Sequence, residues 1–150
     1  PEMLNKGITV GLGTDGCASN NDLDMFREMD SAAKVHKVMS LDPTVVDAET
    51  VCRMATIGGA KLLGLDKLIG SIETGKKADI ILVDMNQPHL TPLYHYYSQL
   101  VYAARGADVN TSIINGRIVM KDRHLLTIDT GDAMKNVRSV AADIMNSQVR

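Results

Sequence analysis

The chain has 150 residues, 45% hydrophobic and 23% charged, a composition typical of one compact soluble domain. A formal net charge of −2, no basic block and 3% aromatic residues argue against a nucleic-acid or anionic-membrane partner. No apolar run approaches the roughly 20 residues of a membrane span, and the wide spacing of Cys17 and Cys52 predicts reduced thiols in a cytoplasmic protein.

Residues 7–13 predict a short strand with two different faces, followed by a sharp loop. Its apolar face carries Ile8, Val10 and Leu12. The other face is nearly bare and leads to the carboxylate of Asp15. A strand of this kind suits a barrel with helices outside and a ligand at the mouth, where barrel enzymes carry their chemistry. An ordinary turn residue is an equally good interpretation of Asp15.

Residues 11–16 also match the G-x-G-x-x-G pattern of dinucleotide-binding folds. In such a fold, Asp15 would place a negative charge against the pyrophosphate. The second strand that should end in an acid about 20 residues later is missing. The pattern therefore does not favour a nucleotide site.

Two helices are predicted after the loop. Asn20, Asn21 or Asp22 can cap the first helix, which should end before Pro43. Its expected buried positions are Leu23, Phe26, Met29, Ala33 and Val38. Asp47 can cap the second helix, whose buried stripe is Val51, Met54 and Ala55. Gly58 and Gly59 predict a break and restart, and Gly64 predicts a C-terminal cap.

From Gly70 the pattern becomes strand-like. We expect a mostly buried strand over 78–84, a helix over 93–104, and a hairpin of 109–114 and 117–120 around Asn115-Gly116. A further strand is expected over 125–128. Thr130 or Asp132 should cap the final helix, with one apolar face formed by Ala133, Val137, Val140, Ala141 and Ile144.

Four stretches, in order, resemble the amidohydrolase superfamily, and most closely its methylthioadenosine/S-adenosylhomocysteine deaminase and chlorohydrolase-like group. They are residues 13–29, 54–65, 69–84, and 100–104 with 109–120. The resemblance implies an α/β fold: residues 1–65 form the end of a metal-dependent (β/α)8 barrel, with strand eight and following helices. Residues 66–150 form the C-terminal part of a small β-sandwich with a terminal helix. A whole barrel needs about 250 residues, so we expect a C-terminal piece of a longer enzyme.

The resemblance also implies a metal-dependent hydrolase that removes the amine from an adenosine-type substrate. The metal is zinc or iron, held by several histidines and by the aspartate after strand eight, for which Asp15 is the counterpart. Asp15 is thus the expected metal ligand and catalytic proton carrier. Ser19 and Asn20 could touch substrate or orient Asp15, although a helix cap is the simpler role. A chlorohydrolase, another ring amidohydrolase and a catalytically silent interaction module remain alternatives.

The four histidines, His36, His89, His95 and His124, have no metal-ligand spacing. We therefore expect the chain alone to hold no metal and to be inactive. Its expected partners are a small-molecule substrate and either a second copy or the missing N-terminal part, because the unpaired strand edges of an incomplete barrel would need covering.

Overall fold

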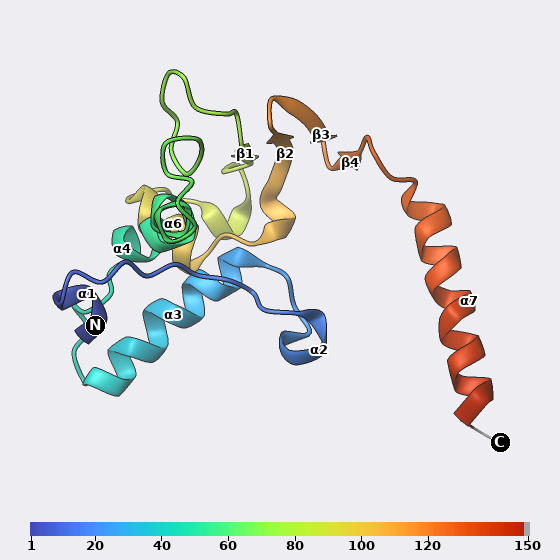
Figure 1. The fold of residues 1–150 in the computed structure, drawn as a ribbon, viewed down its shortest axis with the longest axis horizontal. Helices are drawn as coiled ribbons and strands as arrows, with labels where there is room; N and C mark the ends of the chain where they lie inside the picture. Colours follow the sequence, from blue (N-terminus) through green and yellow to red (C-terminus); the bar gives the residue numbers. More distant parts are fainter. Residues whose placement is uncertain (149–150) are drawn as a thin grey trace.

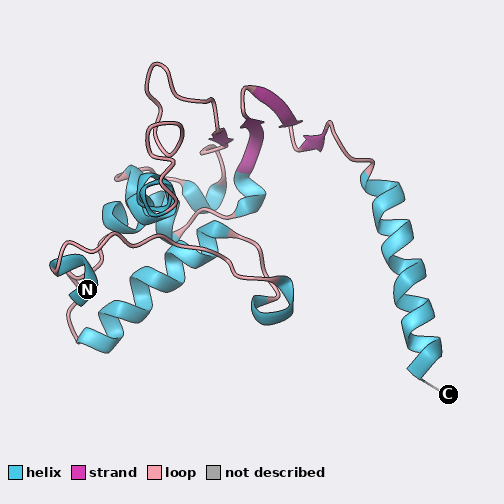
Figure 2. Cartoon of the chain, in the orientation of Figure 1, coloured by secondary structure: helices cyan, strands magenta, loops and turns pink. Residues whose placement is uncertain are grey.

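The computed structural model describes residues 1–148 and contains a helical body, a small antiparallel sheet and a long final helix (Figure 1). Helices form most of the regular structure, and the strands lie in the second half of the chain (Figure 2). The final helix, α7 (Thr130–Gln148), extends away from the body. Among the described residues, no helix combines the length and apolarity needed to cross a bilayer.

The chain begins with α1 (Glu2–Asn5), followed by an extended segment that leads to α2 (Cys17–Asn20). The strand predicted over residues 7–13 is not formed: Gly7 lies in a turn with φ 73°, and residues 8–13 carry no strand assignment. The reason is that a strand needs a hydrogen-bonded neighbour. Instead, the Leu12 amide donates to the Met54 carbonyl at 3.2 Å, so the segment lies against a helix.

Helix α3 (Met25–Ser40) begins later than predicted, because Asp24 caps it and not Asn20, Asn21 or Asp22. The Asp24 Oδ1 atom accepts from the Phe26 amide at 2.9 Å. The predicted core positions Phe26, Met29 and Ala33 are buried, whereas Leu23 and Val38 are exposed. Leu41, in the left-handed conformation, ends the helix.

The second helical stretch is continuous. It consists of α4 (Ala48–Arg53), a π-helical turn η1 (Met54–Gly58) and α5 (Gly59–Leu62). Asp47 caps α4 by accepting from the Thr50 amide at 2.8 Å, as predicted. The predicted break at Gly58-Gly59 is wrong. Left-handed Gly64 follows the end of α5, and its amide bonds the Lys61 carbonyl at 3.0 Å, which confirms its capping role.

The sheet has the order β1-β2-β3-β4, all antiparallel, with β1 (Ile80–Val83), β2 (Val109–Ile114), β3 (Arg117–Lys121) and β4 (His124–Leu125). The predicted Asn115-Gly116 hairpin is confirmed, with Ile113 opposite Ile118. Strand β4 is shorter than the predicted strand over 125–128. Strand β1 is not mostly buried, because Ile81 and Leu82 are 51% and 52% exposed.

One hydrophobic core joins the two halves of the sequence. Short helices η2 (Pro88–Leu90) and η3 (Gly106–Asp108) flank α6 (Tyr96–Tyr102), which lies within the predicted 93–104 helix and packs against α3 and α4. The core residues from both halves include Ala33, Val51, Leu90, Val101 and Ala104. The packed core thus crosses the boundary between residues 1–65 and 66–150. The division of the chain into two domains at that boundary stays a prediction.

The final helix has no such packing. Asp129, and not Thr130 or Asp132, precedes α7 and accepts from the Asp132 amide at 3.0 Å. The apolar face predicted from the spacing exists, but Val137 and Ile144 are 69% and 52% exposed. Within residues 1–148, this face therefore lies open to solvent.

Candidate active site at the Asp15 loop

Asp15 lies in the loop between the extended segment and α2. Its backbone has φ 57°, in the left-handed region that Asp tolerates better than most residues. A Cβ added to either flanking glycine, Gly13 or Gly16, would meet no atom within 4 Å. The Asp15 carboxylate therefore sits in an open loop and not in packed core.

Ser19 holds the Asp15 side chain. Its hydroxyl donates to Asp15 Oδ2 at 2.5 Å, while Gly16 is the N-cap of α2 without a side-chain cap bond. The helix-cap role favoured for Ser19 is therefore wrong, and its role in orienting Asp15 is the one the geometry supports. The Ser19 hydroxyl, helped by the Gly16 backbone N–H, holds the pKa of Asp15 below its ordinary value of 3.8. Asp15 is therefore a carboxylate at neutral pH.

Asn20 ties the same loop to α3. Its side-chain nitrogen donates to the Thr14 carbonyl at 2.8 Å and to Glu28 Oε1 at 2.7 Å. The sequence pattern does not predict a role for Glu28, because it lies eight residues from Asn20 and their approach depends on the path of the chain between α2 and α3. No local spacing signals such a contact.

Three of the four histidines make hydrogen bonds away from Asp15. His89 Nε2 lies 3.0 Å from Asp108 Oδ2, and His95 caps α6 by accepting from the Ser98 amide at 3.2 Å. His124 Nδ1 lies 2.8 Å from the Asp122 carbonyl. His36 lies on α3. Across the described chain, no three His, Cys, Asp or Glu side chains cluster as a metal site would require.

In the His89–Asp108 pair, the Asp108 side chain is buried, at 8% exposed. Burial opposes ionisation of Asp108, but hydrogen bonds from His89 and from the Arg105 amide outweigh it and hold the pKa of Asp108 below its ordinary value. The Arg105 amide donates to Asp108 Oδ2 at 2.8 Å. This pair joins η2 to η3, which is a structural role away from the Asp15 loop.

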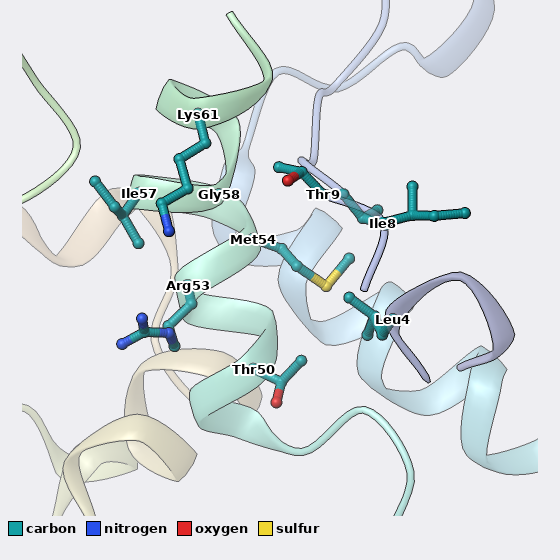
Figure 3. Close-up of a pocket in the computed structure, with 10 residues that line it drawn as sticks. Leu4, Ile8, Thr9, Thr50, Arg53, Met54, Ile57, Gly58 and Lys61 are labelled. Carbon is teal, nitrogen blue, oxygen red and sulfur yellow. The ribbon is translucent and has the colours of Figure 1, made fainter. Parts of the chain in front are cut away.

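A cleft of about 230 Å³ lies at the other end of the extended segment, between residues 8–10 and the α4–α5 helices (Figure 3). Leu4 and Ile8 line one side, and Met54, Arg53 and Lys61 come from the helical stretch on the other side. Asp15 does not line it. The cleft is therefore distinct from the candidate site.

As a donor for a metal, Asp15 fits in part. An exposed, ionised carboxylate is a suitable oxygen ligand for zinc. A catalytic zinc site ordinarily needs about three protein ligands, and residues 1–148 bring together no group of three His, Cys, Asp or Glu side chains that could hold one. The remaining ligands would have to come from another polypeptide segment.

Comparison with known proteins identifies the family. The Amidohydrolase family model matches residues 1–119. A 5-methylthioadenosine/S-adenosylhomocysteine deaminase of Syntrophus aciditrophicus is 58% identical over 97% of this chain and 33% of its own length. A 5'-deoxyadenosine deaminase of Methanosarcina barkeri is 46% identical over 96% of this chain and 33% of its own length.

Solved structures agree with the sequence matches. A zinc-bound adenosine deaminase from Xanthomonas campestris matches with a TM-score of 0.93 and 42% identity, covering 96% of this chain and 33% of that one. The zinc complex of atrazine chlorohydrolase TrzN from Arthrobacter aurescens matches with a TM-score of 0.82 and 27% identity, covering 92% and 31%. The chain spans about a third of the length of the relatives it matches. Both the resemblance and the α/β fold class inferred from the four motifs are confirmed, and the chain belongs to the amidohydrolase family.

Proposed function

We propose that this chain supplies the acidic residue of a zinc-dependent deaminase acting on an adenosine-type substrate, methylthioadenosine or S-adenosylhomocysteine. The 58% identity with a relative named for those two substrates supports the substrate class. The observation that carries the proposal is the ionised Asp15 carboxylate, held by Ser19 in an open loop. Zinc is supported by the two zinc-bound structural relatives, whereas iron rests on the family resemblance alone.

In this proposal Asp15 is both a ligand and a proton carrier. A bound divalent metal would make hydroxide available by lowering the pKa of its water to about 7. The Asp15 carboxylate would take the proton released by that water and deliver it to the departing amine. The overall reaction consumes one water, replaces the ring amine by a carbonyl and releases ammonia. Ser19 would keep the carboxylate aimed, and contact between Ser19 and substrate remains part of the proposal.

The chlorohydrolase alternative keeps the same machinery and changes the leaving group. The match to atrazine chlorohydrolase favours it, although the 27% identity is well below the 58% of the deaminase relative. A catalytically silent homologue is the third possibility. We further propose a cytoplasmic location and a homo-oligomeric state.

A chimera tests these proposals. Residues 1–150 replace the matching third of the Syntrophus aciditrophicus relative, so that the remaining ligands come from the relative. We expect one zinc per chain and release of ammonia from methylthioadenosine. Asp15→Asn should lower turnover by about 10²–10⁴-fold, while Asp143→Asn on exposed α7 should not. Circular dichroism verifies that each chimera is folded.

The possible results separate the alternatives. Near-normal turnover of the Asp15→Asn chimera would show that Asp15 is only a turn residue. Chloride release from a chlorinated triazine without deamination would favour the chlorohydrolase. For residues 1–150 alone, we expect weak, non-stoichiometric metal binding and no hydrolysis. One tightly held zinc per chain would contradict that expectation unless two or more chains share the site.

A further inference from the structure

The Asp15 loop has little packing to hold it in place. Thr14 is half-buried, and the residues from Asp15 to Asn20 are exposed. Asp15 also adopts a left-handed backbone conformation, with φ 57°. A metal-ligating side chain on such a loop would bind the metal more weakly unless polar contacts restricted the loop. The reason is that metal ligands must be held in position for tight binding.

Asn20 provides the contact that reaches the rigid part of the molecule. Both hydrogens of one amide nitrogen have acceptors, since Nδ2 lies 2.8 Å from the Thr14 carbonyl and 2.7 Å from Glu28 Oε1. Glu28 lies on α3 between Phe26 and Met29, both of which are buried in the core. The hydrogen bond from Asn20 to Glu28 thereby links the loop to α3, which is packed into the hydrophobic core.

The chemistry of this contact requires an amide at position 20. Both groups that face Nδ2 are oxygen acceptors, and one of them is the acidic side chain of Glu28. An aspartate of the same shape would place a carboxylate oxygen against these two acceptors and would repel them. The contact is therefore specific to asparagine in a way that shape alone does not explain.

We propose that Asn20 and Glu28 form a positioning pair that holds the Asp15 loop in its metal-binding conformation. The pair does not touch the reacting atoms, and it acts through the Thr14 carbonyl, which immediately precedes Asp15. The inference deepens the proposed function, because it rests on Asp15 being a metal ligand. It gives Asn20 a specific partner and adds Glu28, for which the sequence predicts no role.

The first measurement concerns the loop itself and needs no metal. Backbone NMR order parameters of residues 14–20 in the 150-residue chain should be near about 0.85, typical of ordered backbone, and should fall toward about 0.6 in Asn20→Ala, Asn20→Asp and Glu28→Ala. Glu28→Gln keeps the acceptor oxygen, so its order parameters should stay near the wild-type values. Asn136→Ala, the same truncation on exposed α7, is the matched control.

The second measurement uses the zinc-loaded chimera. Competition with a chelator should show zinc affinity lowered about 10–100-fold by Asn20→Asp and Glu28→Ala, the usual cost of losing an outer-shell partner. Glu28→Gln should restore most of that affinity. The Asn20→Ala and Glu28→Ala changes should not add, because either one removes the same contact.

The outcomes distinguish this inference from the proposed function. Wild-type order parameters and zinc affinity in Asn20→Asp would overturn the positioning pair while leaving the deaminase proposal intact. A loosened loop in Asn20→Ala but not in Glu28→Ala would also overturn the pair. A chimera that binds no zinc would count against the proposed function, and the order parameters would still decide whether Asn20 and Glu28 hold the loop.

Discussion

The Asp24 Oδ2 atom accepts a hydrogen bond from the backbone N–H of Gly106 at 2.9 Å, and the two residues lie 82 positions apart in the sequence. A Cβ on Gly106 would lie 3.2 Å from the Asp24 carboxyl group, so the close approach favours glycine. The other oxygen of Asp24 caps α3. One carboxylate thus links the start of α3 to the start of η3, which precedes β2, and α3 in turn carries Glu28.

Removing this carboxylate should destabilise the chain. We expect Asp24→Ala to lower the free energy of unfolding by about 2–3 kcal/mol, because the helix loses its cap and the Gly106 amide loses its acceptor. Asp24→Asn keeps one acceptor oxygen and should cost about 1 kcal/mol. Urea unfolding measures both, with Asp143→Ala as a control expected to change stability by less than about 0.5 kcal/mol. A loss of unfolding free energy equal to that of the control would contradict the stabilising role of the Asp24 carboxylate.

Gly58 should be irreplaceable by alanine. A Cβ there would lie 2.9 Å from the Arg53 carbonyl and 2.9 Å from the Val10 carbonyl, and both are backbone atoms that cannot turn aside. We expect Gly58→Ala to cost about 1–3 kcal/mol of stability, even though alanine has the better helix propensity. Gly13→Ala is the matched control, since its Cβ would meet nothing within 4 Å. Equal thermal stability of the two variants would show that the close approach is not required.

The titration of Asp15 should report its contact with Ser19. The Ser19 hydroxyl binds the charged form, so the pKa of Asp15 lies below 3.8, and Ser19→Ala should raise it toward that value. Because the pKa is lowered on folding, this contact stabilises the folded chain above the unfolded-state pKa, and the contribution is lost as pH falls through the folded-state pKa. Carboxyl carbon NMR of Asp15 in the two proteins measures the titration. An unchanged pKa in Ser19→Ala would refute the contact.

The open face of α7 should cause self-association. Val137 and Ile144 are exposed along one stripe, and exposed apolar surface of this kind favours contact between chains. Light scattering across a concentration series should show a mass above that of a monomer. A standard interface between two chains buries about 800 Å² per partner. Val137→Glu combined with Ile144→Glu should shift the mass downward, whereas Asn136→Glu should not. A folded monomer at all concentrations would rule out the predicted homo-oligomer.

Much of this protein could be predicted from residues that are close together in the sequence. The Asn115-Gly116 hairpin, the Asp47 cap and the Gly64 terminator each depend on conformational preferences that act within one turn of chain. The amphipathic character of α7 follows from spacing alone. The family and the candidate residue Asp15 were also predicted from local motifs. Each motif is a run of neighbouring residues, so it can be recognised without knowing the fold.

The tertiary structure decided what depends on distant partners. Asp24, and not an earlier residue, caps helix α3, and Gly106 from the second half of the chain donates to the same carboxylate. Gly58 continues a helix that its low propensity would interrupt, because the Val10 carbonyl needs the space that a Cβ would fill. The Asn20–Glu28 contact depends in the same way on the chain path between α2 and α3. Local preference energies are small, so where two distant segments must meet, their packing and hydrogen bonds outweigh those preferences.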